Sequence, residues 1–186
     1  MLNGTIRAAG TSALRDMMTN HLLQLLCFVT MEAPGDLSAE SIRNEKVKVL
    51  NAMRLDIREE ISDAACRGQY GSGVDEKGKK IKGYLEEDRI DPHSDTETFA
   101  AIRLSINNWR WAGVPFYLRT GKRLGRRYSE IVIEFKRQPF SLFANDPNEL
   151  TNKLVIRLQP EETISLHTLN KKPGLTNKLK LQPVEL

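Results

Sequence analysis

The sequence predicts an α+β fold, in which N-terminal helices pack on a mostly antiparallel β-sheet. Apolar residues recur at helical spacing early in the chain and alternate with a period of two in its second half. The candidate strands follow one another without intervening helices, which is typical of antiparallel sheets. Helices first and strands after define the α+β class. We expect one domain over residues 1–186.

The first helix is predicted over residues 12–31. Thr11 or Ser12 is the expected N-cap, and the stretch MEAPGDLS ends the helix. The apolar residues that follow the i, i+3, i+4 spacing are Leu14, Met17, Met18, Leu22, Leu25, Leu26 and Val29. Three polar side chains interrupt this pattern within RDMMTNHLLQLL: Asp16, Asn20 and His21. A lone histidine on an apolar helix is ordinarily a packed residue, so the helix alone does not indicate catalysis.

A second helix is predicted over residues 38–54, with Ser38 as N-cap and Glu40 stabilised by the helix dipole.

The amino-acid composition changes over residues 67–96. They are rich in glycine and charge and poor in large apolar side chains. This composition predicts an exposed, partly mobile loop.

The sheet is predicted over residues 98–182. Apolar and polar positions alternate along 100–106, 114–118, 131–135 and 154–158, and more weakly along 164–169 and 178–181. Trp109 and Trp111 are two residues apart, so we expect both on one strand face, in the core or against another domain.

Composition narrows the class of protein. The chain has 186 residues, of which 40% are hydrophobic and 28% charged, as in globular proteins. No apolar run approaches the roughly 20 residues that a membrane span needs, so we expect no membrane partner. The N-terminus lacks the apolar stretch of a signal peptide, which predicts a cytoplasmic location. Cys27 and Cys66 are expected to be reduced structural thiols, and we expect no metal site.

Positive charge is concentrated in one short segment. The net charge is +4, and RTGKRLGRR, residues 119–127, holds five cations in nine residues with no acid. Such a patch suits phosphate, whether on nucleic acid or on a small metabolite. No glycine-rich dinucleotide fingerprint follows a strand, since GQYGSG lacks both the parallel strand before it and the helix after it.

Four motifs then occur in a recognisable order: ALRDMMTNHLLQLL, RGQYGSG, NWRWAGVPFYLRTGKRL and LVIRLQP. Together they resemble glucose-6-phosphate dehydrogenase of the bacterial type, over residues 4–186. The resemblance implies a two-domain oxidoreductase of the oxidative pentose phosphate pathway. An N-terminal Rossmann domain binds NADP, and a larger α+β domain carries a broad antiparallel sheet that also forms the dimer interface. Hydride passes from C1 of glucose 6-phosphate to the nicotinamide, giving 6-phosphogluconolactone.

The resemblance also implies roles for individual residues. His21 falls on the catalytic base, which takes the proton of the C1 hydroxyl; a neutral imidazole suits this task. Asp16 falls on a carboxylate that accepts hydrogen bonds from sugar hydroxyls. Lys122 and Arg127 fall on substrate-contacting cations, and Gln159 on a substrate-contacting glutamine. In the same patch we interpret Arg123 and Arg126 as surface charge.

Other parts of the family pattern are missing. The Rossmann domain is absent, and so is the R-I-D-H-Y-L-G-K-E motif, which supplies the acid that orients the base. We therefore expect a fragment of the C-terminal domain, with NADP bound mainly by the missing N-terminal domain and no dehydrogenase activity of the isolated chain. Arg119 and Arg157 match cations of a second, structural NADP site. Because Tyr128 and Val132 replace basic residues there, we expect no such site.

Two hypotheses from other classes stay open. The chain could be a non-catalytic dimerisation or interaction fragment that associates through its sheet. An incomplete sheet would also leave exposed edges, so aggregation is a further outcome. A nucleic-acid binder using residues 119–127 is disfavoured, because no aromatic residues are interleaved with these cations and no binding motif is present.

Overall fold

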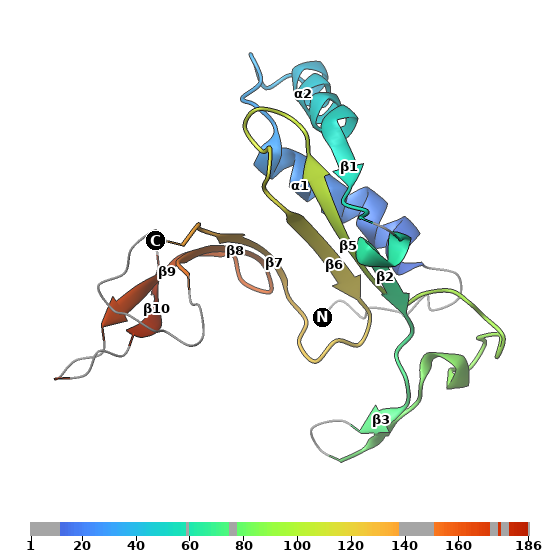
Figure 1. Cartoon of the computed structure of the whole chain (residues 1–186). Helices are drawn as coiled ribbons and strands as arrows, with labels where there is room; N and C mark the ends of the chain where they lie inside the picture. The colour runs from blue at the N-terminus through green and yellow to red at the C-terminus, as the bar shows by residue number, and fades with distance from the viewer. Residues whose placement is uncertain are drawn as a thin grey trace. The chain divides into compact units, whose positions relative to one another are not determined.

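The computed structural model of the chain describes residues 12–58, 60–74, 78–137, 151–171, 175 and 179–185. The chain divides into two compact units, Met1–Arg123 and Leu124–Leu186. Each unit combines its own elements around its own sheet, and each is described by itself (Figure 1). Among the helices described, none has the length and apolar character required to traverse a bilayer.

The first helical stretch of the chain changes its winding part-way. Ala13–Leu22 is a π-helix, η1, and Leu23–Thr30 continues it as the α-helix α1. In a π-helix each N–H bonds to the carbonyl five residues back, as the Leu23 N–H does to the Met18 carbonyl. The wider turn changes which residues face inward. Ala13 and Met18, five residues apart, are buried, whereas Leu14 and Met17, which α spacing would place inward, are 43% and 42% exposed.

The second helix, α2, spans Ala39–Ala52, and its chain continues directly into strand β1. The Ser38 hydroxyl accepts a hydrogen bond from the Ser41 N–H at 3.2 Å, which confirms Ser38 as the N-cap.

The sheet of the first unit is built around one strand, β5, Phe99–Ile106. On one edge β5 pairs with β6, Phe116–Gly121. Its other edge pairs with two short strands placed end to end: β1, Met53–Leu55, and β2, Ala65–Gly68. All three pairings are antiparallel.

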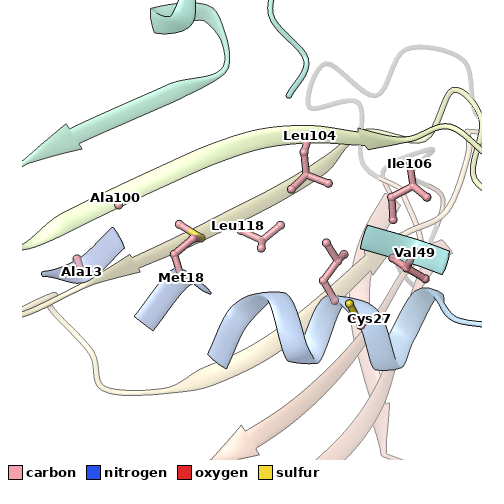
Figure 2. Close-up of a cluster of buried hydrophobic side chains, with 9 residues drawn as sticks. Ala13, Met18, Cys27, Val49, Ala100, Leu104, Ile106 and Leu118 are labelled. Carbon is pink, nitrogen blue, oxygen red and sulfur yellow. The ribbon is translucent and has the colours of Figure 1, made fainter. Parts of the chain in front are cut away.

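The core of the first unit lies between this sheet and the helices. Figure 2 shows Met18 and Cys27 of the helical stretch facing Leu104 and Leu118 of the sheet. The buried apolar side chains that form this cluster are Ala13, Met18, Leu26, Cys27, Val49, Ala100, Leu104, Ile106 and Leu118. The helices therefore cover one face of the sheet, and the predicted α+β class is confirmed.

The segment predicted as an exposed loop, residues 67–96, is more ordered than expected. It contains β3, Gly73–Val74, paired with β4, Lys80–Ile81, and a short 3-10 helix, η3, Tyr84–Glu86; a similar turn, η2, Ile61–Asp63, precedes β2. Tyr84 is buried, its N–H donates to the Tyr70 carbonyl at 2.9 Å, and the two rings meet edge to face at 5.8 Å. Aromatic packing thus holds part of a segment whose glycines and charges predicted only exposure.

The two tryptophans do not share a strand face, contrary to the prediction. They lie in the turn between β5 and β6, and Trp109 is fully exposed. Trp111 alone is packed. Its ring meets Phe116 edge to face at 5.5 Å, and its Nε1 donates to the Thr30 carbonyl at 2.9 Å, at the end of α1.

The second unit is a four-stranded antiparallel sheet in the order β10-β9-β8-β7. Its strands are β7, Ser129–Glu134; β8, Lys153–Gln159; β9, Thr163–Lys171; and β10, Leu179–Glu185. The two weaker strand candidates are thus β9 and β10. The strands predicted as one sheet over 98–182 belong to two separate sheets: β5 and β6 to that of the first unit, and β7, β8, β9 and β10 to that of the second.

Candidate functional site

The π winding of η1 decides how Asp16 and His21 are placed. The two residues are five apart, and in an α-helix of 3.6 residues per turn they would point about 140° apart. A helix closed by i→i+5 bonds has about 4.4 residues per turn, so positions five apart lie one turn above each other on nearly the same face. The local geometry therefore brings the two predicted site residues of this helix together.

Asp16 has one oxygen engaged and one unsatisfied. Its Oδ1 lies 3.5 Å from Nε of Arg15, while its Oδ2 is buried and has no hydrogen-bond partner among the residues that the structure describes. A buried carboxylate oxygen without a donor is unfavourable. The side chain as a whole is 32% exposed, so the carboxylate can still accept a hydrogen bond from a bound hydroxyl.

His21 is exposed, which corrects the default interpretation of a packed core histidine. No hydrogen bond to its ring is found within the described part of the chain, so no described acid fixes its tautomer. The described residues also contain no group of three or more histidine, cysteine or acidic side chains that could hold a metal ion.

Lys122 lies just after β6, in a turn tied to the sheet. Its N–H donates to the Thr98 carbonyl at 2.8 Å. The next residue, Arg123, has a left-handed backbone with φ of 54°. Arg123 is exposed, as interpreted from the sequence, but its charge is paired. Its guanidinium lies 2.5 Å from the Glu87 carboxylate and 5.0 Å from the centre of the Tyr70 ring. Lys122 is therefore held by a packed turn.

Arg127 and Gln159 belong to the second unit, and both are exposed. Gln159 ends β8. Arg127 lines a shallow pocket of about 300 Å³ with neighbours that include Arg126, Arg157 and Tyr128. Arg157 is paired with Glu130 at 3.5 Å and lies over the Tyr128 ring at 5.9 Å. With one acid against three arginines, the pocket is suited to an anion.

Two buried polar residues were missed from the sequence, Glu97 and Thr98, with 8% and 0% exposure. Burial raises the pKa of Glu97, but hydrogen bonds from the Ser12 hydroxyl and the Leu14 N–H, with the nearby charge of Arg67, outweigh it and leave the pKa below its ordinary value. The available sequence signal was a glutamate between two threonines immediately before an alternating strand.

The described residues do not fit a dinucleotide such as NADP. Every strand pair is antiparallel. No glycine-rich turn leads from a strand into a helix within these residues. Binding of a pyrophosphate in the Rossmann manner needs both features, so no described residue is assigned to hold the cofactor.

Comparison with known proteins decides the family. The profile described as glucose-6-phosphate dehydrogenase, C-terminal domain, matches residues 9–186. The chain belongs to the glucose-6-phosphate dehydrogenase family. It is 51% identical over 174 residues to glucose-6-phosphate 1-dehydrogenase of Dickeya dadantii, covering 93% of this chain and 35% of that protein. The enzyme of the same name from Mycolicibacterium smegmatis is 48% identical over 177 residues, covering 95% and 35%.

Solved structures of the glucose-6-phosphate dehydrogenase family agree. A glucose-6-phosphate dehydrogenase in complex with its substrate glucose-6-phosphate superposes with a TM-score of 0.76 at 41% identity, over 94% of this chain and 34% of that one. The Mycobacterium avium glucose-6-phosphate 1-dehydrogenase also gives 0.76, at 31% identity, over 95% and 35%. The chain spans about a third of the length of the relatives it matches.

Proposed function

We propose that this chain is the substrate-side part of an NADP-dependent glucose-6-phosphate dehydrogenase. The complete enzyme would oxidise glucose 6-phosphate to 6-phosphogluconolactone in the cytoplasm, at the start of the oxidative pentose phosphate pathway. Membership of the family and the named relatives support this assignment. The observation that carries it for this chain is the placement of Asp16 and His21 on one face of a π-helix.

In this proposal His21 and Asp16 have different roles toward the sugar. The exposed imidazole of His21 accepts the proton of the C1 hydroxyl as that carbon is oxidised. The partly exposed carboxylate of Asp16 accepts a hydrogen bond from a sugar hydroxyl and so orients the ring one helical turn away. Since their spacing is fixed by the helix backbone, substrate held by Asp16 lies within reach of His21.

The cations bind the anionic substrate. Lys122, held in its turn by the Thr98 carbonyl, contributes a positive charge from the first unit. In the second unit, taken by itself, Arg127 lines the arginine-rich pocket, where a guanidinium can bind phosphate oxygens in a bidentate manner. Gln159 supplies an amide that can exchange hydrogen bonds with sugar hydroxyls.

Two further groups that the reaction needs are not assigned to any described residue. The hydride acceptor, NADP in this proposal, has no fitting site among the described residues. An acid that orients the ring of His21 is also not found among them. We therefore expect the isolated chain to show no dehydrogenase activity, because an unoriented base without a bound hydride acceptor cannot complete the reaction.

A chimera tests the function directly. Residues 9–186 replace the matching segment of the Dickeya dadantii enzyme, and NADP reduction is measured with glucose 6-phosphate. The chimera is expected to be active, and His21→Asn is expected to lower its kcat about a thousandfold, within the range for loss of a general base. His93→Asn, which changes another exposed histidine, is the matched control and should retain full activity. An active chimera that is indifferent to His21→Asn contradicts the proposal.

A feature of the second unit supports association with a second copy of the chain. We propose this dimerisation either as an alternative to the enzymatic role or together with it. Residues opposite each other in antiparallel strands share a face, and the register aligns one apolar face across all four strands. That face consists of Ile131, Ile133, Leu154, Ile156, Ile164, Leu166 and Val184. None of these side chains is buried. A homodimer through this sheet face would remove them from water.

Light scattering with size exclusion tests this association. The chain is expected to be dimeric, and Ile156→Lys to make it monomeric without unfolding the first unit. Val155→Lys places the same charge on the opposite face of the same strand and should leave the dimer intact, as should Val132→Lys on the neighbouring strand. A strict monomer at high concentration overturns the homodimer.

A further inference from the structure

Glu97 holds the start of the π-helix. Its Oε1 accepts hydrogen bonds from the Ser12 hydroxyl and, at 2.9 Å, from the Leu14 N–H. Its own carbonyl accepts from the Ala13 N–H at 3.2 Å. The Asp16 N–H in turn donates to the Ser12 carbonyl at 3.0 Å. The backbone at Asp16 is thus fixed to a residue that Glu97 binds directly.

Thr98, the next residue, holds the turn that carries Lys122. Its carbonyl accepts the Lys122 N–H at 2.8 Å, and its N–H donates to the Gly68 carbonyl at 2.9 Å. Its hydroxyl accepts the Tyr70 N–H at 2.9 Å. All polar groups of this fully buried threonine are therefore engaged, and they join two separate segments to the start of β5.

A second route leads from Thr98 to the same turn through Tyr70. The ring of Tyr70 lies under the guanidinium of Arg123, the neighbour of Lys122, at 5.0 Å. Arg123 also binds Glu87 and donates to the Lys82 carbonyl at 3.3 Å. The backbone of Lys122 is consequently held by Thr98, and the side chain of its neighbour Arg123 contacts Tyr70, whose N–H Thr98 binds.

We propose that Glu97 and Thr98 are positioning residues, which set the placement of Asp16 relative to Lys122. Glu97 binds the start of η1, which carries Asp16, and Thr98 binds the turn after β6, which carries Lys122. Burying a carboxylate is costly, and apolar side chains of similar size often give equal or greater stability. The hydrogen bonds of this pair instead fix two separate segments in one geometry. The proposal rests on the assignment of Asp16 and Lys122 as binders of glucose 6-phosphate.

The first test measures the network itself, by amide hydrogen exchange on the full chain. Thr98→Val keeps the shape of the side chain but removes the acceptor for the Tyr70 N–H. The Tyr70 amide should then exchange about tenfold faster, while the interior of β5 remains protected. Thr98→Ser retains the hydroxyl and is the matched control. In Glu97→Gln the Leu14 amide should be the one that exchanges faster.

The second test measures positioning, by titrating the full chain with glucose 6-phosphate and following amide shifts. Thr98→Val should weaken binding about fivefold, and Thr98→Ser should remain within about twofold of the unchanged chain. In a Lys122→Met background, Thr98→Val should cause no further weakening, because the group it positions is gone. A residue that acted only on stability would lower the melting temperature and leave the Kd unchanged.

The outcomes separate this inference from the proposed function. An unchanged Kd in Thr98→Val, or an equal loss in the Lys122→Met background, overturns the positioning role. If the unchanged chain does not bind glucose 6-phosphate, that failure belongs to the proposed function. The exchange data are then the only test, and equal exchange of the Tyr70 amide in Thr98→Val and in the unchanged chain overturns the network.

Discussion

The two units of this chain differ in how they deal with their apolar residues. In the first unit the helices cover one face of the sheet, and side chains such as Leu104 and Ile106 are almost fully excluded from water. In the second unit no described side chain is buried, although apolar residues align across all four strands. Both sheets are four-stranded and antiparallel, so strand pairing alone does not create a core.

This difference shows which unit has two packed layers among its described residues. A sheet needs a second layer to bury its apolar face, and the first unit finds that layer in the preceding helices. The second unit presents an apolar face without a described layer of its own. We expect the first unit to supply most of the stability of the isolated chain, and the second to depend on association.

The largest expected effect compares one leucine from each unit. Leu104→Ala removes a side chain that is 1% exposed and should lower the free energy of unfolding by about 3 kcal/mol. Leu166→Ala, in the half-exposed sheet of the second unit, should cost about 1 kcal/mol. Both tryptophans lie in the first unit, so their fluorescence during denaturation measures Leu104→Ala, and amide exchange in β8 and β9 measures Leu166→Ala. Equal losses for the two variants would break the comparison.

The next effect depends on pH and belongs to Glu97. Its pKa is lowered in the folded state, so as pH falls the unfolded chain takes up this proton first. The stability that Glu97 contributes is fully present above its ordinary value of 4.5 and is lost as pH falls through the folded value. Glu97→Gln should therefore cost about 1.5 kcal/mol at neutral pH and less in acid. Urea denaturation at several pH values measures this, and a cost that grows in acid contradicts it.

A smaller effect is expected at the turn after β6. Arg123→Ala should cost about 1 kcal/mol, because it removes the contacts with Glu87 and Tyr70 but keeps the left-handed backbone strain. Arg123→Gly should be about 1 kcal/mol more stable than Arg123→Ala, since glycine adopts positive φ freely. Arg126→Ala, on an exposed cation of the same segment, is the control and should be nearly neutral in thermal melts.

The smallest effect on the free energy of unfolding is predicted for Trp109, a large side chain that is fully exposed. Trp109 lies in the well-packed first unit but is fully exposed, so Trp109→Ala should change the free energy of unfolding by less than about 0.5 kcal/mol. The variant also leaves Trp111 as a single fluorescent probe at the end of α1, which sharpens the comparison of the units. A loss similar to that of Leu104→Ala would show that Trp109 is packed in solution.

The sequence predicted the fold class because periodicity reports which side of an element is buried. Alternation along residues 100–106 and 154–158 corresponds to β5 and β8. It could not show that these strands belong to different sheets, because both have the same period. Helical spacing likewise indicated a helix at residues 12–31 but not its winding. The exposure of Leu14 and Met17 follows from i→i+5 bonds that no residue pattern announces.

The candidate site was predictable only in part. Asp16, His21 and Lys122 were identified by motif resemblance, and their proposed roles still await the experiments above. No sequence motif identifies Glu97 and Thr98. Their proposed positioning role depends on contacts between segments more than 20 residues apart in the chain. The ion pair and ring contact of Arg123 were not predictable for the same reason, since its partners Glu87 and Tyr70 are distant in sequence.

The two cysteines give the chain an internal chemical reference. Cys66 is exposed on β2, whereas Cys27 is 1% exposed in α1, and burial raises the pKa of the Cys27 thiol against the opposing charge of Lys46. Alkylating reagents attack the thiolate, so a limiting amount should modify Cys66 rapidly and Cys27 only when the helix leaves the sheet. The ratio of the two labels would then report how often the first unit opens, without any engineered probe.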